Sequence, residues 1–283
     1  MKKIKVNSSF NDKKVSDVIF YYYPNLNPNQ LFKAFRKRDI RINNVKISKD
    51  TVVKANDEIT IYIIDSILEN DKKVVVIYED DNILVVDKPD YINVVENDES
   101  ITLTKLLKKK YGESIEPCHR IDRNTKGLVI FAKNQKSLDE MKKLFANHKI
   151  NKFYLALVSG TFVDKHKVLN AYLFKDSRKS MVYISDFYKE GYKPITTEYY
   201  VLKEDLGNNT SLLEILLHTG RTHQIRAHLA HVGHPIIGDG KYGDNQINKK
   251  FSRKTQELFA YKVEFNLFGK DYKIELPNYE KLF

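Results

Sequence analysis

Apolar residues recur along this chain with two different spacings. Short or alternating apolar runs predict strands, and a spacing of three or four residues predicts helices. Short apolar or alternating runs bounded by turn residues predict strands at Ile83–Val86, Leu128–Ala132, Lys152–Gly160 and Leu212–His218. A spacing of three or four residues between Ile225, Leu229 and Val232 predicts a helix instead, with Thr222 as its cap. The chain therefore mixes both element types, with strands in the majority.

The strand at 152–160 has a chemically unusual face. Period-two alternation places Phe153, Leu155 and Leu157 on one face of the strand. Tyr154, Ala156 and Val158 lie on the other face. Tyr154 stands beside the small Ala156, which leaves room above its ring. The alternative is that Tyr154 only packs across strands, as tyrosines often do.

The first 65 residues predict a small α/β unit. Helical spacing appears around Val15–Phe20 and Leu31–Phe35, and alternating strand patterns follow at Ile40–Ile42 and Ile59–Ile63. The charged, polar stretch Asp65–Lys72 reads as a connector. We therefore expect two domains, residues 1–65 and 73–283.

Charge points to a polyanionic partner. The net charge is +11, and residues 1–65 hold 13 Lys and Arg against 7 Asp and Glu, which is more than half of the excess. A basic surface kept for solubility is the alternative. The basic residues that we expect to contact the phosphates of such a partner in this unit are Lys33, Arg36, Lys37, Arg38 and Arg41.

The sequence says less about the cellular compartment and the oligomeric state of the protein. A single cysteine, Cys118, excludes internal disulfides and fits a reducing cytoplasm, where we expect it to serve only packing. The sequence contains no apolar run of about 18 residues and no signal-peptide core behind Met1, so we expect no membrane insertion. We further expect a monomer.

The densest chemistry lies in the stretch from His119 to Gly127, His-Arg-Ile-Asp-Arg-Asn-Thr-Lys-Gly. Its carboxylate, Asp122, stands between Arg120 and Arg123, whose charges favour an anion there. A carboxylate on a loop held by a buried strand suits a nucleophile. The alternative is a surface loop with solvated ion pairs.

This stretch resembles the signature of the RluA-type pseudouridine synthases. Residues 74–89 and 219–243 resemble two further motifs of that family in the same order. The resemblance implies an α+β fold with a mixed, mainly antiparallel sheet and flanking helices. It also implies that Asp122 is catalytic, that Tyr154 lines the catalytic pocket, that Arg221 of Gly-Arg-Thr-His pairs with Asp122, and that Arg120 fills the space of a flipped base. We further expect Tyr154 to lie against the base, where it can help to remove the C5 proton, and Arg120 and Arg123 to contact RNA.

Two details qualify the resemblance. Residues 35–48 resemble an S4 RNA-binding module, which implies that the N-terminal unit binds RNA. After Lys88 and Pro89 the family usually has a glycine, whereas this chain has Asp90 and Tyr91, so the path of that loop stays open. Lys88 itself reads equally well as a solvated lysine at a strand end.

The expected reaction is the isomerisation of uridine in RNA, by analogy ribosomal RNA, with no metal or organic cofactor. Whether Asp122 attacks the sugar C1′ or the uracil ring stays open, as does the target uridine. One alternative is a catalytically silent RNA-binding protein that aids ribosome assembly. Another is a metal-dependent hydrolase built on five clustered histidines, which are His218, His223, His228, His231 and His234.

Overall fold

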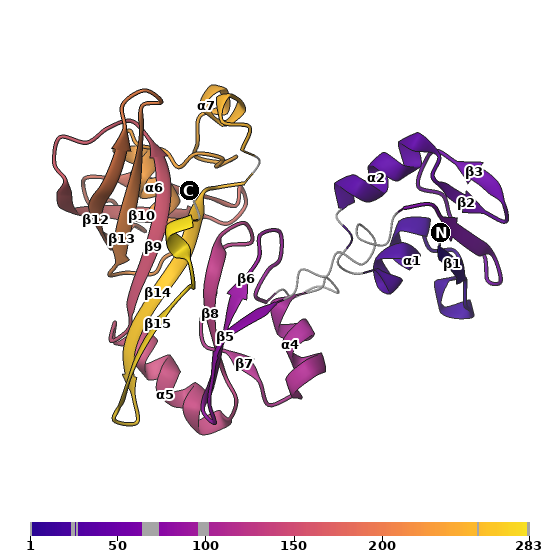
Figure 1. The fold of residues 1–283 in the computed structure, drawn as a ribbon, viewed down its shortest axis with the longest axis horizontal. Coiled ribbons are helices and arrows are strands. Elements are labelled where there is room, and N and C mark those ends of the chain that lie inside the picture. The colour runs from indigo at the N-terminus through magenta and orange to yellow at the C-terminus, as the bar shows by residue number, and fades with distance from the viewer. Residues whose placement is uncertain are drawn as a thin grey trace. The chain divides into compact units, whose positions relative to one another are not determined.

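The computed structural model describes residues 2–23, 26, 28–63, 74–95, 102–253 and 255–281. These residues form two compact units, one within Met1–Lys73 and the other within Val74–Phe283 (Figure 1). Each unit has hydrophobic core residues of its own. The predicted connector Asp65–Lys72 lies outside the described residues, so the boundary at that stretch stays a prediction.

The N-terminal unit is a small antiparallel sheet with two helices. The strand order is β1 (Lys2–Lys5), β4 (Glu58–Ile61), β2 (Ile40–Ile42) and β3 (Val45–Ile47). Helices α1 (Val15–Tyr22) and α2 (Pro28–Lys37) follow a short 3-10 turn, η1 (Ser8–Phe10). Val15, Val18 and Ile19 of α1 and Leu31, Ala34 and Phe35 of α2 are buried in one cluster with the sheet, whereas Phe32 is exposed. The helical spacing read from the sequence therefore identifies most of this core.

The C-terminal unit contains a sheet of eleven strands among its described residues. Its main path runs in the order β11-β10-β12-β13-β9-β14-β8-β6-β5, with β15 beside β14 and β7 beside β8. Only β14 and β8 pair in parallel, and the other described pairs are antiparallel, so the predicted mixed sheet is confirmed. The strands are β5 (Val75–Glu79), β6 (Ile83–Lys88), β7 (Glu116–Pro117), β8 (Lys126–Ala132), β9 (Asn151–Ser159), β10 (His166–Asp176), β11 (Met181–Ser185), β12 (Lys193–Asp205), β13 (Thr210–Leu217), β14 (Leu258–Leu267) and β15 (Lys270–Glu275).

Helices flank this sheet, as Figure 1 shows. They are α4 (Leu103–Tyr111), α5 (Gln135–Ala146), α6 (Gln224–His231) and α7 (Asn245–Lys250), with a 3-10 turn η2 (Tyr279–Lys281). None of the helices in the described ranges is long and apolar enough to cross a membrane.

Alternation along the central strands divides the core into two layers. On β9, Tyr154, Ala156 and Val158 belong to the layer that also holds apolar residues of α4 and α6. Leu155 belongs to the opposite layer, which includes residues of α5. The alternation predicted for residues 152–160 is confirmed, and it directs Tyr154 toward α6.

Candidate active site

Asp122 lies on the short loop that joins β7 to β8. The loop closes through the Thr125 backbone N–H, which donates to the Asp122 carbonyl at 3.1 Å. Thr125 is buried, and its hydroxyl oxygen accepts a 2.6 Å hydrogen bond from Gln256 Nε2. The Asp122 side chain nevertheless keeps 22% of its surface exposed. The fold thus holds this backbone firmly and leaves the carboxylate open to a ligand.

Lys88, at the end of β6, also holds the Asp122 loop in place. It is fully buried, so the alternative of a solvated lysine at the strand end is wrong. Its ammonium donates to three carbonyls, those of Pro89, Ile92 and Arg123, at 2.8–3.0 Å. Because a buried ammonium needs such acceptors, Lys88 joins the chain after Pro89 to the Asp122 loop.

Gly127 is required where β8 passes β14. Its φ is +111°, and a Cβ atom there would lie 2.1 Å from the Ala260 carbonyl oxygen. Only glycine accepts both the backbone conformation and the close approach. The strand carrying Asp122 therefore enters the sheet in direct contact with β14.

Arg226 of α6 is the ion-pair partner of Asp122. Its Nη1 donates to Asp122 Oδ2 at 2.9 Å, while Nε and Nη2 donate to the buried Asp239 at 2.7 and 2.9 Å. Burial opposes the charge on Arg226, but Asp239 and Asp122 outweigh it and raise the pKa of Arg226. Among the described residues no donor reaches Asp122 Oδ1, so this oxygen is available for chemistry.

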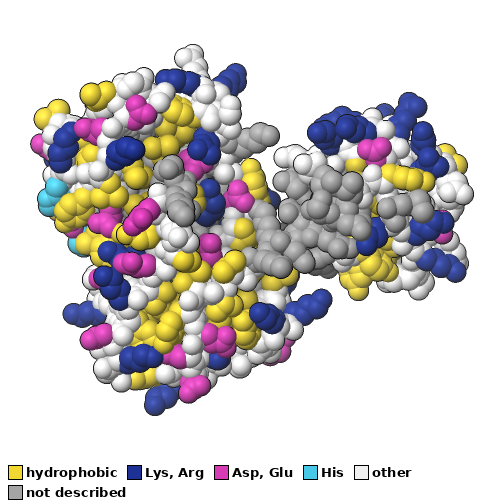
Figure 2. Space-filling model, in the orientation of Figure 1, with side chains coloured by type: hydrophobic (Ala, Val, Ile, Leu, Met, Phe, Trp, Pro, Cys, Tyr) yellow, Lys and Arg dark blue, Asp and Glu magenta, His cyan; other side chains and the backbone are white. Residues whose placement is uncertain are grey.

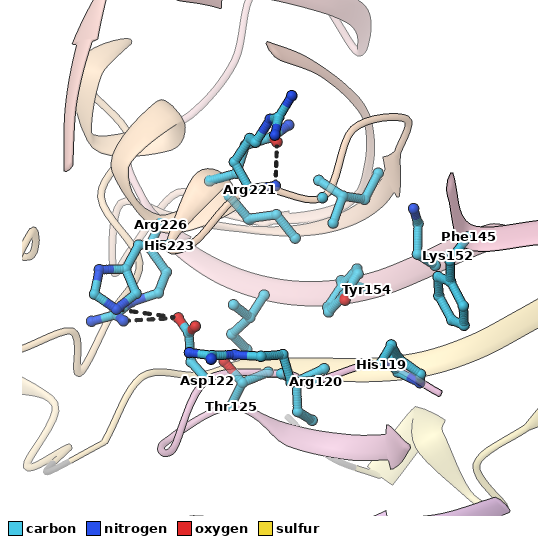
Figure 3. A pocket seen from close by; sticks show the side chains of 16 residues that line it. His119, Arg120, Asp122, Thr125, Phe145, Lys152, Tyr154, Arg221, His223 and Arg226 are labelled. Atoms are coloured by element: carbon cyan, nitrogen blue, oxygen red, sulfur yellow. Dashed lines mark hydrogen bonds and ion pairs between the residues drawn. The ribbon is translucent and has the colours of Figure 1, made fainter. Parts of the chain in front are cut away.

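The pairing expected for Arg221 is therefore wrong. Arg221 precedes α6, and Figure 3 shows its side chain extending away from Asp122. Its backbone N–H donates to Gln224 Oε1 at 3.1 Å, which closes the turn before the helix. The predicted cap at Thr222 is also wrong, because His223 occupies the N-cap in a left-handed conformation with φ of 53°. This start places Arg226 in the first turn, facing the loop.

His223 completes the surroundings of Asp122. Its Nε2 lies 3.9 Å from Asp122 Oδ2, and its Nδ1 lies 2.9 Å from the Tyr242 hydroxyl. The same hydroxyl oxygen accepts a 2.9 Å hydrogen bond from the Val182 backbone N–H. Burial lowers the pKa of His223 even though Asp122 opposes this shift. A neutral imidazole in this arrangement turns Nε2–H toward Asp122.

Asp122 stands where two cavities of the C-terminal unit meet. The first extends past Tyr154 to Lys152, His119 and Phe145 (Figure 3). The second lies toward Asn93, Arg123 and Lys241. Arg120, Ile121, His223 and Arg226 border both cavities together with Asp122. The two cavities therefore meet at Asp122 and share these four neighbours.

The arginines flanking Asp122 do not pair with it. Arg120 and Arg123 are exposed, and the Arg123 Nε donates to the Tyr91 carbonyl at 3.2 Å. Both side chains border the second cavity. Cys118 packs in the core, and burial raises the pKa of its thiol to about 12, which agrees with a packing role.

The clustered histidines each have a different neighbour. His218 lies 2.7 Å from Glu198, His228 lies 3.0 Å from the Thr197 hydroxyl and His231 lies 2.9 Å from Asp186. His234 lies 3.0 Å from the Ser159 carbonyl. In the ranges that the structure describes, no group of three His, Cys, Asp or Glu residues could hold a metal ion.

The basic residues of the N-terminal unit gather around the end of α2. Lys33, Arg36, Lys37 and Arg38 are exposed, and Arg41 lies over the Tyr62 ring at 4.7 Å. Figure 2 shows Lys and Arg side chains collected on this unit. Such a surface suits contacts to phosphates, which need charge more than shape.

The fold and the site together define an RNA pseudouridine synthase. A family model described as RNA pseudouridylate synthase matches residues 82–231, a range that contains Asp122, Tyr154 and Arg226. The chain belongs to this family, and within it to the RluA type. The metal-dependent hydrolase and the catalytically silent binding protein are not favoured by these matches.

Individual relatives support the same assignment. The chain is 30% identical to ribosomal large subunit pseudouridine synthase C of Buchnera aphidicola, over 89% of this chain and 84% of that protein. It is 33% identical to an uncharacterized RNA pseudouridine synthase of Mycoplasma genitalium, over 93% and 88%. The solved structure of human RNA pseudouridylate synthase domain containing 1 shares the fold, with a TM-score of 0.63 and 24% identity over 73% of this chain and 84% of that one.

Proposed function

We propose that this protein converts a specific uridine of large-subunit ribosomal RNA, 23S RNA in bacteria, into pseudouridine, with Asp122 as the nucleophile. The observation that carries the proposal is the placement of Asp122 where two cavities meet, with Oδ2 bonded to Arg226 and Oδ1 open. The relatives named as ribosomal large subunit enzymes favour this RNA.

A uridine must leave the helical stack before its glycosidic bond can be exchanged. In the proposed complex the flipped uracil enters the cavity beside Tyr154, and the exposed Arg120 fills the space that the base leaves. Asp122 then attacks either C1′ or the uracil ring. The C1′–N1 bond breaks, the base turns, and C5 bonds to C1′. The bond to Asp122 breaks again, C5 loses its proton to solvent and N1 takes one up, so the carboxylate is regenerated.

Arg226, rather than Arg221, would orient Asp122 throughout this reaction. Its guanidinium is itself fixed by two hydrogen bonds to Asp239, so the carboxylate meets a rigid partner. Arg221 borders the first cavity with an exposed side chain, and a contact to the RNA backbone is the role that suits it.

Tyr154 would support the uracil ring by stacking. The sequence left open that it removes the C5 proton, which requires its phenolate. Burial, together with the charge of Asp122, raises the pKa of Tyr154, so the hydroxyl stays protonated at neutral pH. A neutral phenol can stack against the uracil ring and donate a hydrogen bond, but it is a poor base.

The N-terminal unit would act as an S4-like RNA anchor. Its exposed Lys33, Arg36, Lys37 and Arg38 offer charge without a base-reading groove, which suits affinity rather than sequence readout. We also propose that the protein acts as a monomer, as expected from the sequence. A cytoplasmic location, predicted from the lone cysteine, is part of the same proposal.

The decisive experiment combines mapping with one substitution. Pseudouridine is mapped in ribosomal RNA from cells with and without the gene, and the missing site is then offered to purified protein. Asp122→Asn should abolish the reaction under single-turnover conditions while RNA binding survives. Asp164→Asn, which loses a surface ion pair to Lys167 outside both cavities, is the matched control and should keep full activity. An active Asp122→Asn protein would refute the proposed nucleophile.

A further inference from the structure

Lys152 is a buried cation in the first cavity that the mechanism above does not use. It lies on β9, and only 9% of its surface is exposed. The other buried cation of this cavity, Arg226, is paired with two carboxylates. The Lys152 ammonium has no hydrogen-bond or ion-pair partner among the residues that the structure describes, although its backbone is paired in the sheet.

Leaving an ammonium buried and unpaired is unfavourable for folding. Burial accordingly lowers the pKa of Lys152. Its neighbour His119 is a neutral imidazole, because burial lowers its pKa to about 3. The His119 Nε2 already accepts a 3.0 Å hydrogen bond from the Ile130 backbone N–H, so Nδ1 carries the proton and cannot accept from Lys152. An unpaired ammonium in a cavity therefore indicates that a bound ligand supplies the missing hydrogen-bond acceptor.

The position of Lys152 indicates which part of a ligand it would meet. Lys152 and Tyr154 are two residues apart on the same face of β9, which separates their Cα atoms by about 7 Å. In Figure 3, Tyr154 lies between Asp122 and Lys152. A uracil attached at Asp122 and stacked on Tyr154 therefore points its far edge toward Lys152.

The far edge of that ring carries a carbonyl. In uracil C4 lies opposite N1, so O4 points directly away from the glycosidic bond. We propose that Lys152 donates a hydrogen bond to O4 of the flipped uracil and stabilises the negative charge that the ring acquires during the reaction. The inference rests on the proposed function, since it needs a uridine bound with its ribose at Asp122.

Both routes left open for Asp122 place negative charge on O4. If the carboxylate attacks C1′, its electron pair forms the new O–C1′ bond. The C1′–N1 pair leaves with the ring, and the charge spreads over N1, O2 and O4. If the carboxylate adds to C6, the C5=C6 pair moves into an enolate that ends at O4. A cation at O4 lowers the barrier in either case.

The same donor also serves the rotated base. The half-turn that exchanges N1 for C5 also exchanges C4 for C2, so O2 then faces Lys152 in the place of O4. Cytosine carries an amino group at C4, which cannot accept a hydrogen bond from an ammonium. Lys152 therefore also selects uridine against cytidine.

The first test is Lys152→Met, which keeps the length of the side chain and removes its charge. We expect the single-turnover rate to fall by about 10²–10³, as for the loss of one such donor. The midpoint of urea unfolding should not fall, because an unpaired buried charge is removed. The matched control is Lys262→Met on the adjacent β14, whose side chain is 15% exposed, lies over Phe153 and borders neither cavity. This variant should keep the wild-type rate.

The second test changes the acceptor instead. RNA with 4-thiouridine at the target position replaces O4 by sulfur, a weaker acceptor, and should slow wild-type protein by about tenfold or more. Lys152→Met should show no such difference between the two RNAs. A thio effect that persists in Lys152→Met, with a salt slope reduced by about 0.7, would assign the ammonium to a phosphate and overturn the proposal. If Lys152→Met keeps the wild-type rate while Asp122→Asn is inactive, this inference fails and the proposed function stands.

Discussion

Arg226→Met tests the central ion pair most directly. Methionine keeps the length and apolar stem of the side chain and removes three hydrogen bonds, one to Asp122 and two to Asp239. Asp239 is 1% exposed and would keep only the backbone N–H groups of Lys241 and Tyr242. Leaving one partner of a buried ion pair alone costs about 3–5 kcal/mol, and we expect a loss of that size in the free energy of unfolding.

A second variant separates the two carboxylates. Arg226→Met/Asp239→Asn no longer buries an unpaired charge, so about 1–3 kcal/mol of the lost stability should return. Activity should not return, because Asp122 still has no partner to orient it. Urea unfolding measures the stability, and single-turnover pseudouridine formation measures the activity.

Arg221→Met is the matched control, since it removes an arginine five residues earlier that is exposed and unpaired with Asp122. It should unfold within about 0.5 kcal/mol of wild type, as surface substitutions do. The reasoning would be refuted if Arg221→Met were the more destabilised variant. It would also be refuted if Arg226→Met cost less than about 1 kcal/mol.

Four further outcomes follow from particular contacts. Lys33→Gln/Lys37→Gln should weaken RNA binding and lower the salt slope by up to about 1.4, measured by titration at several ionic strengths, if both side chains meet phosphates. His119 has a pKa of about 3 in the fold against an ordinary 6.5, so the unfolded chain takes up a proton that the fold does not. Its share of stability should therefore fall by about 1.4 kcal/mol per pH unit as the pH drops from 6.5 toward 3, a dependence that urea titrations should find missing in His119→Gln. Gly127→Ala should lower the unfolding midpoint sharply, because its Cβ meets Ala260, whereas Gly112→Ala, which meets no atom within 4 Å, should lose only what its positive φ costs. Chelator should leave activity unchanged, and zinc found by elemental analysis at one ion per chain would contradict this expectation.

The sequence was sufficient for the features that local patterns determine. The alternation of residues 152–160 sets which side chains share a face, because successive strand residues point to opposite sides wherever the strand lies. The stretch around Asp122 was recognisable because charged residues that break into a buried strand stand out against its apolar pattern. The excess charge of residues 1–65 required only counting.

Local sequence patterns could not predict which side chains from distant segments form ion pairs in the folded protein. Arg221 precedes α6 and Arg226 lies in its first turn, and the choice between the two arginines depends on where α6 starts and which face it turns inward. One signal was present, since Arg226 stands between the apolar residues Ile225 and Ala227, Asp239 follows in the chain, and a buried arginine requires a carboxylate. Without the position of the helix, the sequence did not show which carboxylates Arg226 would contact.

Lys88 and Lys152 show the same division. In the sequence each is a lysine at the end of a strand, which solvent normally covers. The tertiary structure buries both, one against three carbonyls and the other in an open cavity. Burial depends on segments far away in the chain, here the loops carrying Asp122 and Gly220. A strand pattern contains no record of those segments, so only the folded chain decided which lysine has a partner and which has room for one.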